Sequence, residues 1–243
     1  MNKPDYISKP DWELALKKYD EEYVLKKIKA HYPIQYLIGN VDFYGCQINV
    51  NENVLIPRYE TELLVENTIK LLKENKINTP KILDIGTGSG CIAISLAKNI
   101  NSYVTALDIS SRALEIAKSN AELNDVDIKF IEKDILTNDI TNKYDLIISN
   151  PPYIKEGDTV DSQTKYEPQN ALFAKHNGLL FYEEIIKKSV GHLNPNGILA
   201  FEIGMEQASS LKEMVKYYYP NSEFILKQDY SNKDRMVFII NKE

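Results

Sequence analysis

Apolar and amphipathic stretches alternate along the chain from residue 80 onward. Short apolar stretches with the length of buried strands occupy residues 81–85, 103–108, 128–132, 144–149, 198–202, 223–228 and 236–240. Stretches with the apolar spacing of helices occupy residues 91–99, 111–124, 178–193 and 206–219. This alternation predicts an α/β fold with a doubly wound, mostly parallel, seven-stranded sheet. The last two strands have no helix between them, so we expect them to form an antiparallel pair at one edge.

The segment 150–177 shows no clear helix or strand pattern. A loop of that length inside a compact domain is usually functional or disordered. We interpret residues 154–177 as a loop that closes over a bound acceptor.

Residues 11–31 have helical spacing. Apolar side chains recur every three or four residues at Trp12, Leu16, Tyr19 and Tyr23. They form one predicted apolar stripe. Ser8 offers a capping hydroxyl at the start, and Pro33 ends the pattern. We therefore predict a helical segment that packs as an appendage, with length enough for one long helix or two short ones.

Residues 35–56 change to an alternation of apolar and polar side chains, interrupted by glycine and asparagine. This period of two predicts a β-hairpin. Residues 60–74 return to helical spacing, with one side formed by Leu64, Val65, Thr68 and Leu72. The predicted organisation is a short helical N-terminal segment over residues 1–33, a β-hairpin linker over 34–57 and a main domain over 58–243.

The composition is that of a soluble globular protein, with 43% hydrophobic and 26% charged residues in 243. The longest purely apolar stretches span only a few residues, so we expect no membrane-spanning helix. Residues 1–9 lack the apolar core of a signal peptide. Cys46 and Cys91 are too few for a disulfide framework or a cysteine-rich metal site, which fits reduced thiols in a cytoplasmic protein. We predict no metal.

The formal net charge is −6, and it is distributed unevenly. Residues 1–33 hold seven lysines and six acidic residues, which gives them about +1 and the remainder about −7. A protein that wraps a nucleic-acid duplex usually has a basic surplus, because phosphate neutralisation supplies much of its affinity. The composition therefore disfavours nucleic acid as a partner.

A glycine-rich loop follows the first strand of the main domain. That strand ends in Asp84-Ile85, and the loop consists of Gly86, Thr87, Gly88, Ser89 and Gly90. Glycines permit a tight turn and a close approach of a ligand, and the following helix presents free N–H groups. A nicotinamide-binding loop would read G-x-G-x-x-G, whereas the third glycine here comes one residue early. An acid directly before the loop suits a ligand with an ammonium group, such as S-adenosylmethionine.

Acidic residues also follow the next two strands. Asp108 ends the second strand about 20 residues after the glycine loop, a position suited to binding ribose hydroxyls. Asp134 follows the third strand and is placed to face an adenine edge, beside the apolar wall that Ile135 offers. Acids at three successive strand ends lie at the edge where open α/β sheets bind ligands.

The fourth strand ends in a short motif that consists of Asn150, Pro151, Pro152 and Tyr153. Prolines fix the backbone and remove donors, so nearby carbonyls remain free to accept hydrogen bonds. Asn150 adds a side-chain acceptor, and the Tyr153 ring can stack on a flat conjugated group. Such a site can hold an NH₂ group from two sides and turn the nitrogen lone pair toward an electrophilic methyl group.

The D-x-G-x-G-x-G loop, the acids at 108 and 134 and the N-P-P-Y motif resemble the class I S-adenosylmethionine-dependent N-methyltransferases, whose sheet is Rossmann-like. Further motifs are similar to those of the peptide chain release factor glutamine methyltransferases. They are Pro33–Gly39, Phe43–Gly45, Val54–Glu62, Tyr166–Pro168, Ala171-Leu172, Glu202–Gly204 with Gln207, and Asp229–Ser231 with Asp234-Arg235. The resemblance covers residues 33–240. The chain departs from the family pattern at Tyr59, where the family usually has proline, and at Asn232, where it has glycine.

The resemblance implies methylation of the glutamine side-chain amide in the Gly-Gly-Gln motif of bacterial release factors, with S-adenosylmethionine as cofactor. In that reading Asn150 and the Pro151 carbonyl hold the NH₂ group, and Tyr153 packs on the amide plane. Members of the family commonly carry a five-helix N-terminal domain, whereas about 33 residues precede the linker here. The sequence gives no oligomeric state.

Three alternatives stay open at this point. An N-methyltransferase acting on a nucleic-acid base (DNA adenine or ribosomal RNA) would share everything except the linker motifs. A nicotinamide oxidoreductase is disfavoured by the glycine spacing. A non-catalytic adaptor could keep the same fold, but the intact N-P-P-Y motif argues against it.

Overall fold

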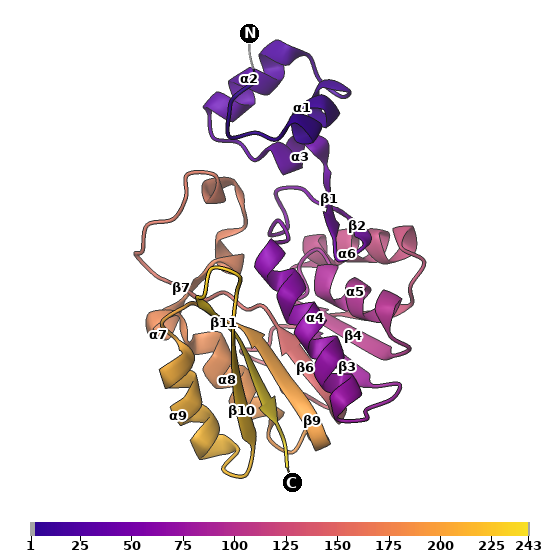
Figure 1. Cartoon of the computed structure of the whole chain (residues 1–243), viewed down its shortest axis with the longest axis vertical. Coiled ribbons are helices and arrows are strands. Elements are labelled where there is room, and N and C mark those ends of the chain that lie inside the picture. Colours follow the sequence, from indigo (N-terminus) through magenta and orange to yellow (C-terminus); the bar gives the residue numbers. More distant parts are fainter. Residues whose placement is uncertain (1–2, 243) are drawn as a thin grey trace.

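The computed structural model describes residues 3–242, so residues 1, 2 and 243 of the predicted first and last segments lie outside the described part. A seven-stranded sheet forms the centre of the molecule (Figure 1). In sheet order its strands are β10 (Glu223–Gln228), β11 (Asp234–Ile240), β9 (Leu193–Glu202), β6 (Tyr144–Ser149), β3 (Lys81–Ile85), β4 (Tyr103–Asp108) and β5 (Ile128–Glu132). The five strands from β9 to β5 run parallel, whereas β11 is antiparallel to both β9 and β10. The predicted sheet and its antiparallel edge pair are therefore confirmed.

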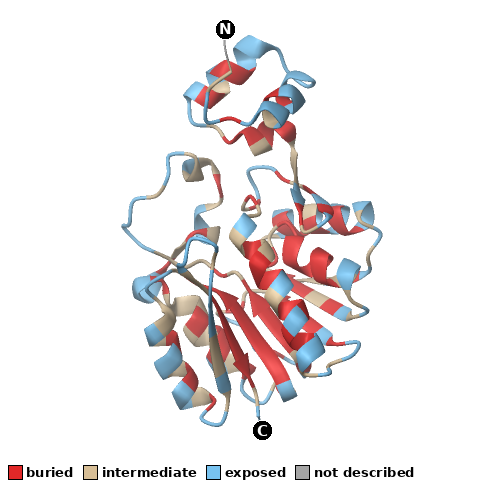
Figure 2. Ribbon diagram, viewed as in Figure 1, coloured by how far each residue is buried: buried red, intermediate tan, exposed pale blue. Residues whose placement is uncertain are grey.

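Helices cover both faces of the sheet. One face packs against α4 (Tyr59–Glu74), α5 (Cys91–Asn99) and α6 (Ser111–Leu123), and the other packs against α8 (Leu180–Ser189) and α9 (Ala208–Tyr218). Ile82 belongs to the first cluster and its neighbour Leu83 to the second, because successive strand side chains point to opposite faces. Buried residues accordingly run the length of the central strands (Figure 2). None of the described helices is long and apolar enough to span a membrane.

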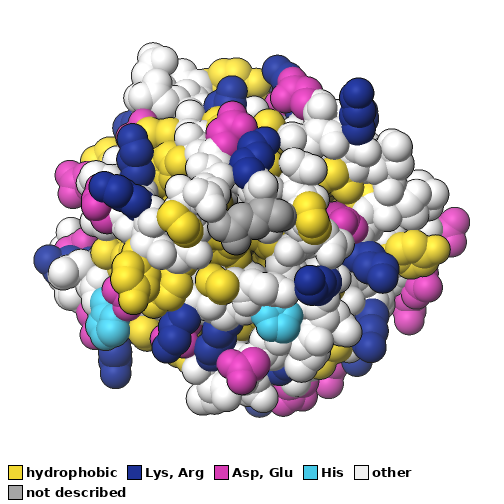
Figure 3. Space-filling model, turned by 90° about the horizontal axis from the view of Figure 1, so that it is seen from below, with side chains coloured by type: hydrophobic (Ala, Val, Ile, Leu, Met, Phe, Trp, Pro, Cys, Tyr) yellow, Lys and Arg dark blue, Asp and Glu magenta, His cyan; other side chains and the backbone are white. Residues whose placement is uncertain are grey.

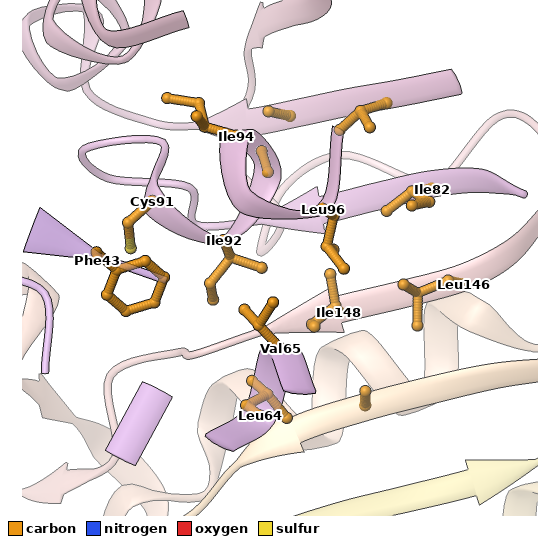
Figure 4. Close-up of a cluster of buried hydrophobic side chains, with 14 of the residues drawn as sticks. Phe43, Leu64, Val65, Ile82, Cys91, Ile92, Ile94, Leu96, Leu146 and Ile148 are labelled. Atoms are coloured by element: carbon orange, nitrogen blue, oxygen red, sulfur yellow. The ribbon is translucent and has the colours of Figure 1, made fainter. Parts of the chain in front are cut away.

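The predicted hairpin is present as β1 (Asn40–Phe43) and β2 (Cys46–Asn49). Tyr44 and Gly45 form its two-residue turn, with φ of 46° and 75°, as hairpin turns of this length require. Phe43 is 1% exposed and anchors the hairpin in the first core cluster, beside Cys91 at the start of α5 (Figure 4).

The N-terminal residues form a separate small core above the hairpin (Figure 1). Its helices are α1 (Lys9–Leu16), α2 (Glu21–Lys29) and α3 (Ile34–Ile38). Its buried side chains are Ile7, Trp12, Ala15, Val24, Leu25, Ile28, Ile34, Leu37 and Ile38. We call the part of the chain that forms this cluster, residues 7–38, the N-terminal unit.

The predicted helical segment over residues 11–31 consists of two short helices, whereas the predicted apolar stripe was wrong beyond Trp12, because Leu16, Tyr19 and Tyr23 are exposed. The chain breaks after α1, and the Asp20 carboxyl starts α2 by accepting a hydrogen bond from the Tyr23 amide. Tyr19 and Tyr23 stack on each other at 5.1 Å but are 40% and 39% exposed. The predicted cap at Ser8 is confirmed, because its side chain accepts from the Asp11 amide.

Other boundaries also differ from those predicted. Residues 34–38, expected in the hairpin, form α3, which ends at Gly39 with φ of 84°. The segment 150–177 contains β7 (Ile154–Lys155), β8 (Phe173–Ala174), the 3₁₀ turns η1 (Thr164–Tyr166) and η2 (Gln169–Ala171), and the start of the single turn α7 (Lys175–Gly178). β9 begins at Leu193 rather than at 198, and α8 ends at Ser189 rather than at 193.

Candidate active site

A cavity of about 500 Å³ opens at the carboxyl ends of the parallel strands. This is the edge at which open α/β sheets bind ligands, and the volume falls in the range of small-molecule sites, about 300–1,000 Å³. The predicted site residues that line it are Gly86, Gly88, Asp108, Asp134, Ile135, Asn150, Pro151 and Pro152. The predicted site residues that do not line it are Asp84, Thr87, Ser89, Gly90 and Tyr153.

The glycine loop needs its glycines for two different reasons. Gly86 and Gly88 have φ of 73° and 55°, and a Cβ at either would meet no atom within 4 Å, so they provide a left-handed backbone at an open cavity wall. A Cβ on Gly90 would instead lie 2.9 Å from the Ile94 side chain and 3.1 Å from Ala117. Gly90 therefore permits α5 to pack closely against α6.

Asp84 lies behind the loop. It is fully buried, and its Oδ2 accepts a hydrogen bond of 2.6 Å from the Thr87 hydroxyl, which fixes the loop from inside. Burial raises the pKa of the Asp84 carboxyl to about 7, with a further increase from Asp108, while the Thr87 hydroxyl acts in the opposite direction. Its Oδ1 is buried and has no hydrogen-bond partner among the described residues. The direct pairing of Asp84 with an ammonium group therefore stays a prediction.

Asp108 connects the second strand end to the glycine loop. Its Oδ2 accepts from the Gly88 amide at 2.8 Å, and its Oδ1 accepts from the Ser110 amide at 2.9 Å. Burial raises the pKa of Asp108, and these two amides oppose that change. Each carboxylate oxygen can accept a second hydrogen bond, so Asp108 can still bind hydroxyl groups in the cavity.

Asp134 folds the chain after β5 into a turn. Its Oδ1 accepts from the Leu136 amide at 2.8 Å, which is the geometry of an Asx turn. Ile135, between them, is 7% exposed and lines the cavity. The turn thus places a carboxylate and an apolar surface side by side on one wall.

Gln207 holds the end of the N-P-P-Y motif in place. Its Nε2 donates to the Tyr153 carbonyl at 3.1 Å and to the Gly178 carbonyl at 3.2 Å, while its Oε1 accepts from the Gly204 amide. A Cβ on Gly178 would lie 2.2 Å from the Tyr153 carbonyl oxygen, so glycine is required there. No described residue donates a hydrogen bond to the carbonyl of Pro151, which lines the cavity.

Asn150 is the first member of a buried polar chain. Its Nδ2 donates to the Thr61 hydroxyl at 3.1 Å, and that hydroxyl donates to Glu202 Oε2 at 2.6 Å. Tyr153 donates its hydroxyl to Glu202 Oε1 at 3.3 Å. Burial raises the pKa of Glu202, whereas the Thr61 hydroxyl, Arg235 and Tyr153 favour its carboxylate form.

The Tyr153 ring does not line the cavity. It packs at the edge of the second core cluster, and its Cδ2 lies 3.5 Å from the position of a Cβ on Gly204. Burial raises the pKa of its hydroxyl well above the ordinary value. Its stacking on an acceptor stays a prediction.

The segment 154–177, predicted to be a closing loop, forms hydrogen bonds with the linker. Glu167 is 4% exposed, and its carboxylate accepts from the Ile56 amide at 3.2 Å and from the Arg58 guanidinium. Tyr166 donates its hydroxyl to the Ala30 carbonyl at 2.9 Å and packs edge-on against Tyr32 of the N-terminal unit. The neighbouring residues Pro168, Asn170 and Ala171 line the cavity.

Two asparagines on α6 connect the hairpin to the main domain. Asn120 accepts from the Asn49 amide at 2.8 Å and donates to the Asn49 carbonyl at 3.0 Å, and Asn124 makes the same pair of bonds with Gln47. Two strand residues span about 6.6 Å and four helical residues about 6 Å, so the spacings match. Asn120 also donates to the Ser89 carbonyl in the glycine loop at 2.9 Å.

The sequence named Thr61 and Glu202 only as parts of family motifs, without a role, and did not single out Asn120, although all three are buried beside the site. Glu202 ends β9, so it is one more acid at the carboxyl edge of the sheet, and the rule that drew attention to Asp108 could have found it. Nothing in the sequence marks Asn120. Among residues 3–242, no group of three or more His, Cys, Asp or Glu side chains is placed to hold a metal ion.

The fold and the cavity define a class I methyltransferase. Residues 59–227 match the family model described as "Methyltransferase small domain". The structure is similar to that of a methyltransferase from Pyrococcus furiosus, with a TM-score of 0.61 at 19% identity, over 91% of this chain and 96% of that one.

Sequence relatives narrow the class to one family. The chain is 45% identical to the release factor glutamine methyltransferase of Flavobacterium psychrophilum, over 98% of this chain and 86% of the relative. It is 43% identical to the protein of that name from Lactococcus lactis, over 89% of this chain and 80% of the relative. The chain belongs to the family of release factor glutamine methyltransferases.

Both departures from the family pattern fit the structure. Asn232 has φ of 57°, the left-handed conformation that asparagine tolerates better than most residues other than glycine. Tyr59 is the first residue of α4, where proline is favoured for its fixed φ. Its ring is 60% exposed and stacks on Tyr230 at 6.0 Å, so the substitution disturbs no buried contact.

Proposed function

We propose that the protein transfers a methyl group from S-adenosylmethionine to the side-chain amide nitrogen of the glutamine in the Gly-Gly-Gln motif of peptide chain release factors. The observation that carries the proposal is that Asn150 and Pro151 line the same cavity as Gly86, Gly88 and Asp108. The candidate site for an NH₂ group and the candidate donor site thus share one cavity. The names of the relatives support the choice of substrate, and this substrate would make the cytoplasm the place of action.

The cavity walls fit the chemical groups of the methyl donor. Asp108 has free acceptor positions for ribose hydroxyls, and Asp134 with Ile135 offers an acceptor and an apolar surface for an adenine ring. Gly86 and Gly88 leave space for the methionine part to approach the backbone. When bound, the donor supplies a methyl group on a positively charged sulfur.

The amide nitrogen of the substrate is a poor nucleophile, because its lone pair is delocalised into the amide. Asn150 Oδ1 and the Pro151 carbonyl accept its two hydrogens and turn the lone pair toward the methyl carbon. Positive charge would develop on this nitrogen as it gained the methyl group, with the bonding pair of the broken C–S bond left on sulfur. The same two oxygens stabilise that charge. The proton leaves afterwards to solvent, so these residues suffice without a strong base.

Mass spectrometry of a release factor incubated with the protein and S-adenosylmethionine tests the proposal. We expect a gain of one methyl group on the glutamine of the Gly-Gly-Gln motif. Asn150→Ala should lower turnover by about 10²-fold or more, while the cofactor affinity measured by calorimetry changes little. Near-normal turnover in this variant, or an unmodified glutamine with the unaltered protein, would reject the assignment.

DNA and ribosomal RNA serve as competing acceptors in the same assay. The face opposite the N-terminal unit, which lies away from the carboxyl ends of the parallel strands, carries interspersed basic and acidic side chains (Figure 3). Preferential methylation of either nucleic acid would replace the release factor as substrate. Donor binding without methylation of any acceptor would favour a non-catalytic role.

A further inference from the structure

The orientation of the Asn150 amide decides whether it can accept a hydrogen bond from an NH₂ group. An asparagine side chain can present either its oxygen or its NH₂ group in one direction, and the two choices have almost the same shape. Only the Asn150 oxygen can accept a hydrogen bond from the NH₂ group of the substrate. Two NH₂ groups that face each other offer only donors. A site of this kind therefore needs something that fixes the direction of the amide.

The hydrogen bonds that connect Glu202, Thr61 and Asn150 can point in only one direction. Glu202 is 2% exposed, and the Thr61 hydroxyl lies 2.6 Å from its Oε2, a distance typical of a hydroxyl that donates to a carboxylate. A carboxylate can only accept hydrogen bonds, so the single proton of the Thr61 hydroxyl is used in this contact. The Thr61 oxygen can then only accept from its other neighbour.

That other neighbour is Asn150. Its Nδ2 donates to the Thr61 oxygen at 3.1 Å, and no described residue donates to its Oδ1. Asn150 lines the cavity, and its amide oxygen remains available for the acceptor. We propose that Thr61 and Glu202 are positioning residues, which set the direction of the Asn150 amide so that its oxygen faces the NH₂ group to be methylated.

The other end of the chain keeps Glu202 in the acceptor-only form. Burial raises the pKa of Glu202, but the Thr61 hydroxyl, the charge of Arg235 and the Tyr153 hydroxyl, which donates to Oε1 at 3.3 Å, favour the carboxylate. This arrangement also gives Tyr153 a part in the site, although its ring does not line the cavity. The inference rests on the proposed function only in requiring an NH₂ acceptor, and it holds for any substrate that presents one.

Substitutions at Thr61 test the proposed role of these hydrogen bonds. Thr61→Val keeps the shape of the side chain and removes the hydroxyl, so the Asn150 amide loses the partner that fixes it. We expect kcat for release factor methylation to fall about 10- to 100-fold, with the cofactor Kd and the KM for release factor within about twofold of the unaltered protein. Thr61→Ser keeps the hydroxyl and should retain kcat within about threefold.

Thr68→Val is a matched control on the same helix. Thr68 is also fully buried, but its hydroxyl has no hydrogen-bond partner among the described residues. We expect Thr68→Val to leave kcat unchanged. If Thr61→Val does not fold, as judged by loss of donor binding, the smaller Thr61→Ala replaces it, with the same expected fall in kcat.

Two results would overturn the inference. One is a normal kcat in Thr61→Val, which would show that Asn150 needs no partner to set its direction. The other is an equal fall in Thr61→Ser and Thr61→Val, which would show that Thr61 acts through packing alone. Failure of the proposed function is a different result, because the unaltered protein would then leave the release factor unmodified.

Discussion

Removal of Asn120 should both loosen the hairpin and weaken the donor site. The side chain is fully buried and makes three hydrogen bonds, two with the backbone of Asn49 and one with the Ser89 carbonyl. Asn120→Ala leaves these three backbone groups without a partner. Each such bond contributes about 0.5–1.5 kcal/mol, so we expect the free energy of unfolding to fall by about 2–4 kcal/mol.

Asn124→Ala is the matched control. Asn124 makes the same pair of bonds with Gln47, but these bonds are exposed and the side chain does not reach the glycine loop. Water can replace its contacts, so we expect a loss of about 1 kcal/mol or less. The two variants thus separate the loop contact from the hairpin contact.

Urea unfolding measures the stability of both variants, and calorimetry measures their affinity for S-adenosylmethionine. We expect the affinity to fall in Asn120→Ala, because the Ser89 carbonyl is released and the glycine loop can move. The affinity should stay unchanged in Asn124→Ala. Equal losses of stability in the two variants, or unchanged donor binding in Asn120→Ala, would refute this reasoning.

Three further predictions concern the acids. Asp108→Ala should weaken donor binding at least tenfold in calorimetry, since it removes both the proposed ribose contact and the contact with Gly88. Because burial raises the pKa of Asp84 from 3.8 to about 7, the folded state favours its protonated form, so its contribution to stability should fall as pH rises across that range. Relative to Asp84→Asn, the unaltered protein should lose up to about 1.4 kcal/mol per pH unit there in urea unfolding. Glu167→Gln should lower the melting temperature by several degrees, because it weakens the contact between the buried carboxylate and Arg58.

The sheet and its site could be predicted from the sequence because they depend on local patterns. The strands β3, β4, β5, β6 and β10 are stretches of five or six residues that have the predicted bounds. Asp108 and Asp134 line the cavity because parallel strands bring their carboxyl ends to one edge. The same patterns gave the position of the glycine loop.

The N-terminal unit was harder to predict, because apolar spacing does not distinguish core tyrosines from surface tyrosines. Tyr19 and Tyr23 have helical spacing, yet they stack on each other at the surface, and the buried face uses Val24, Leu25 and Ile28. The series of hydrogen bonds from Asn150 through Thr61 to Glu202 could not be predicted either. Thr61 precedes Asn150 by 89 positions and Glu202 by 141 positions in the sequence, and only the folded sheet brings the three together.

The contacts of Tyr166 and Glu167 have a mechanical consequence. Besides the polypeptide link through the hairpin, the N-terminal unit is held by the Tyr36 hydroxyl, which donates to the Val54 carbonyl at 2.7 Å, and by the bond from Tyr166 to the Ala30 carbonyl. Because Val54, Pro168 and Ala171 line the cavity, a rotation of the N-terminal unit must either break these bonds or displace the cavity wall. Movement of the N-terminal unit should therefore be coupled to the shape of the cavity.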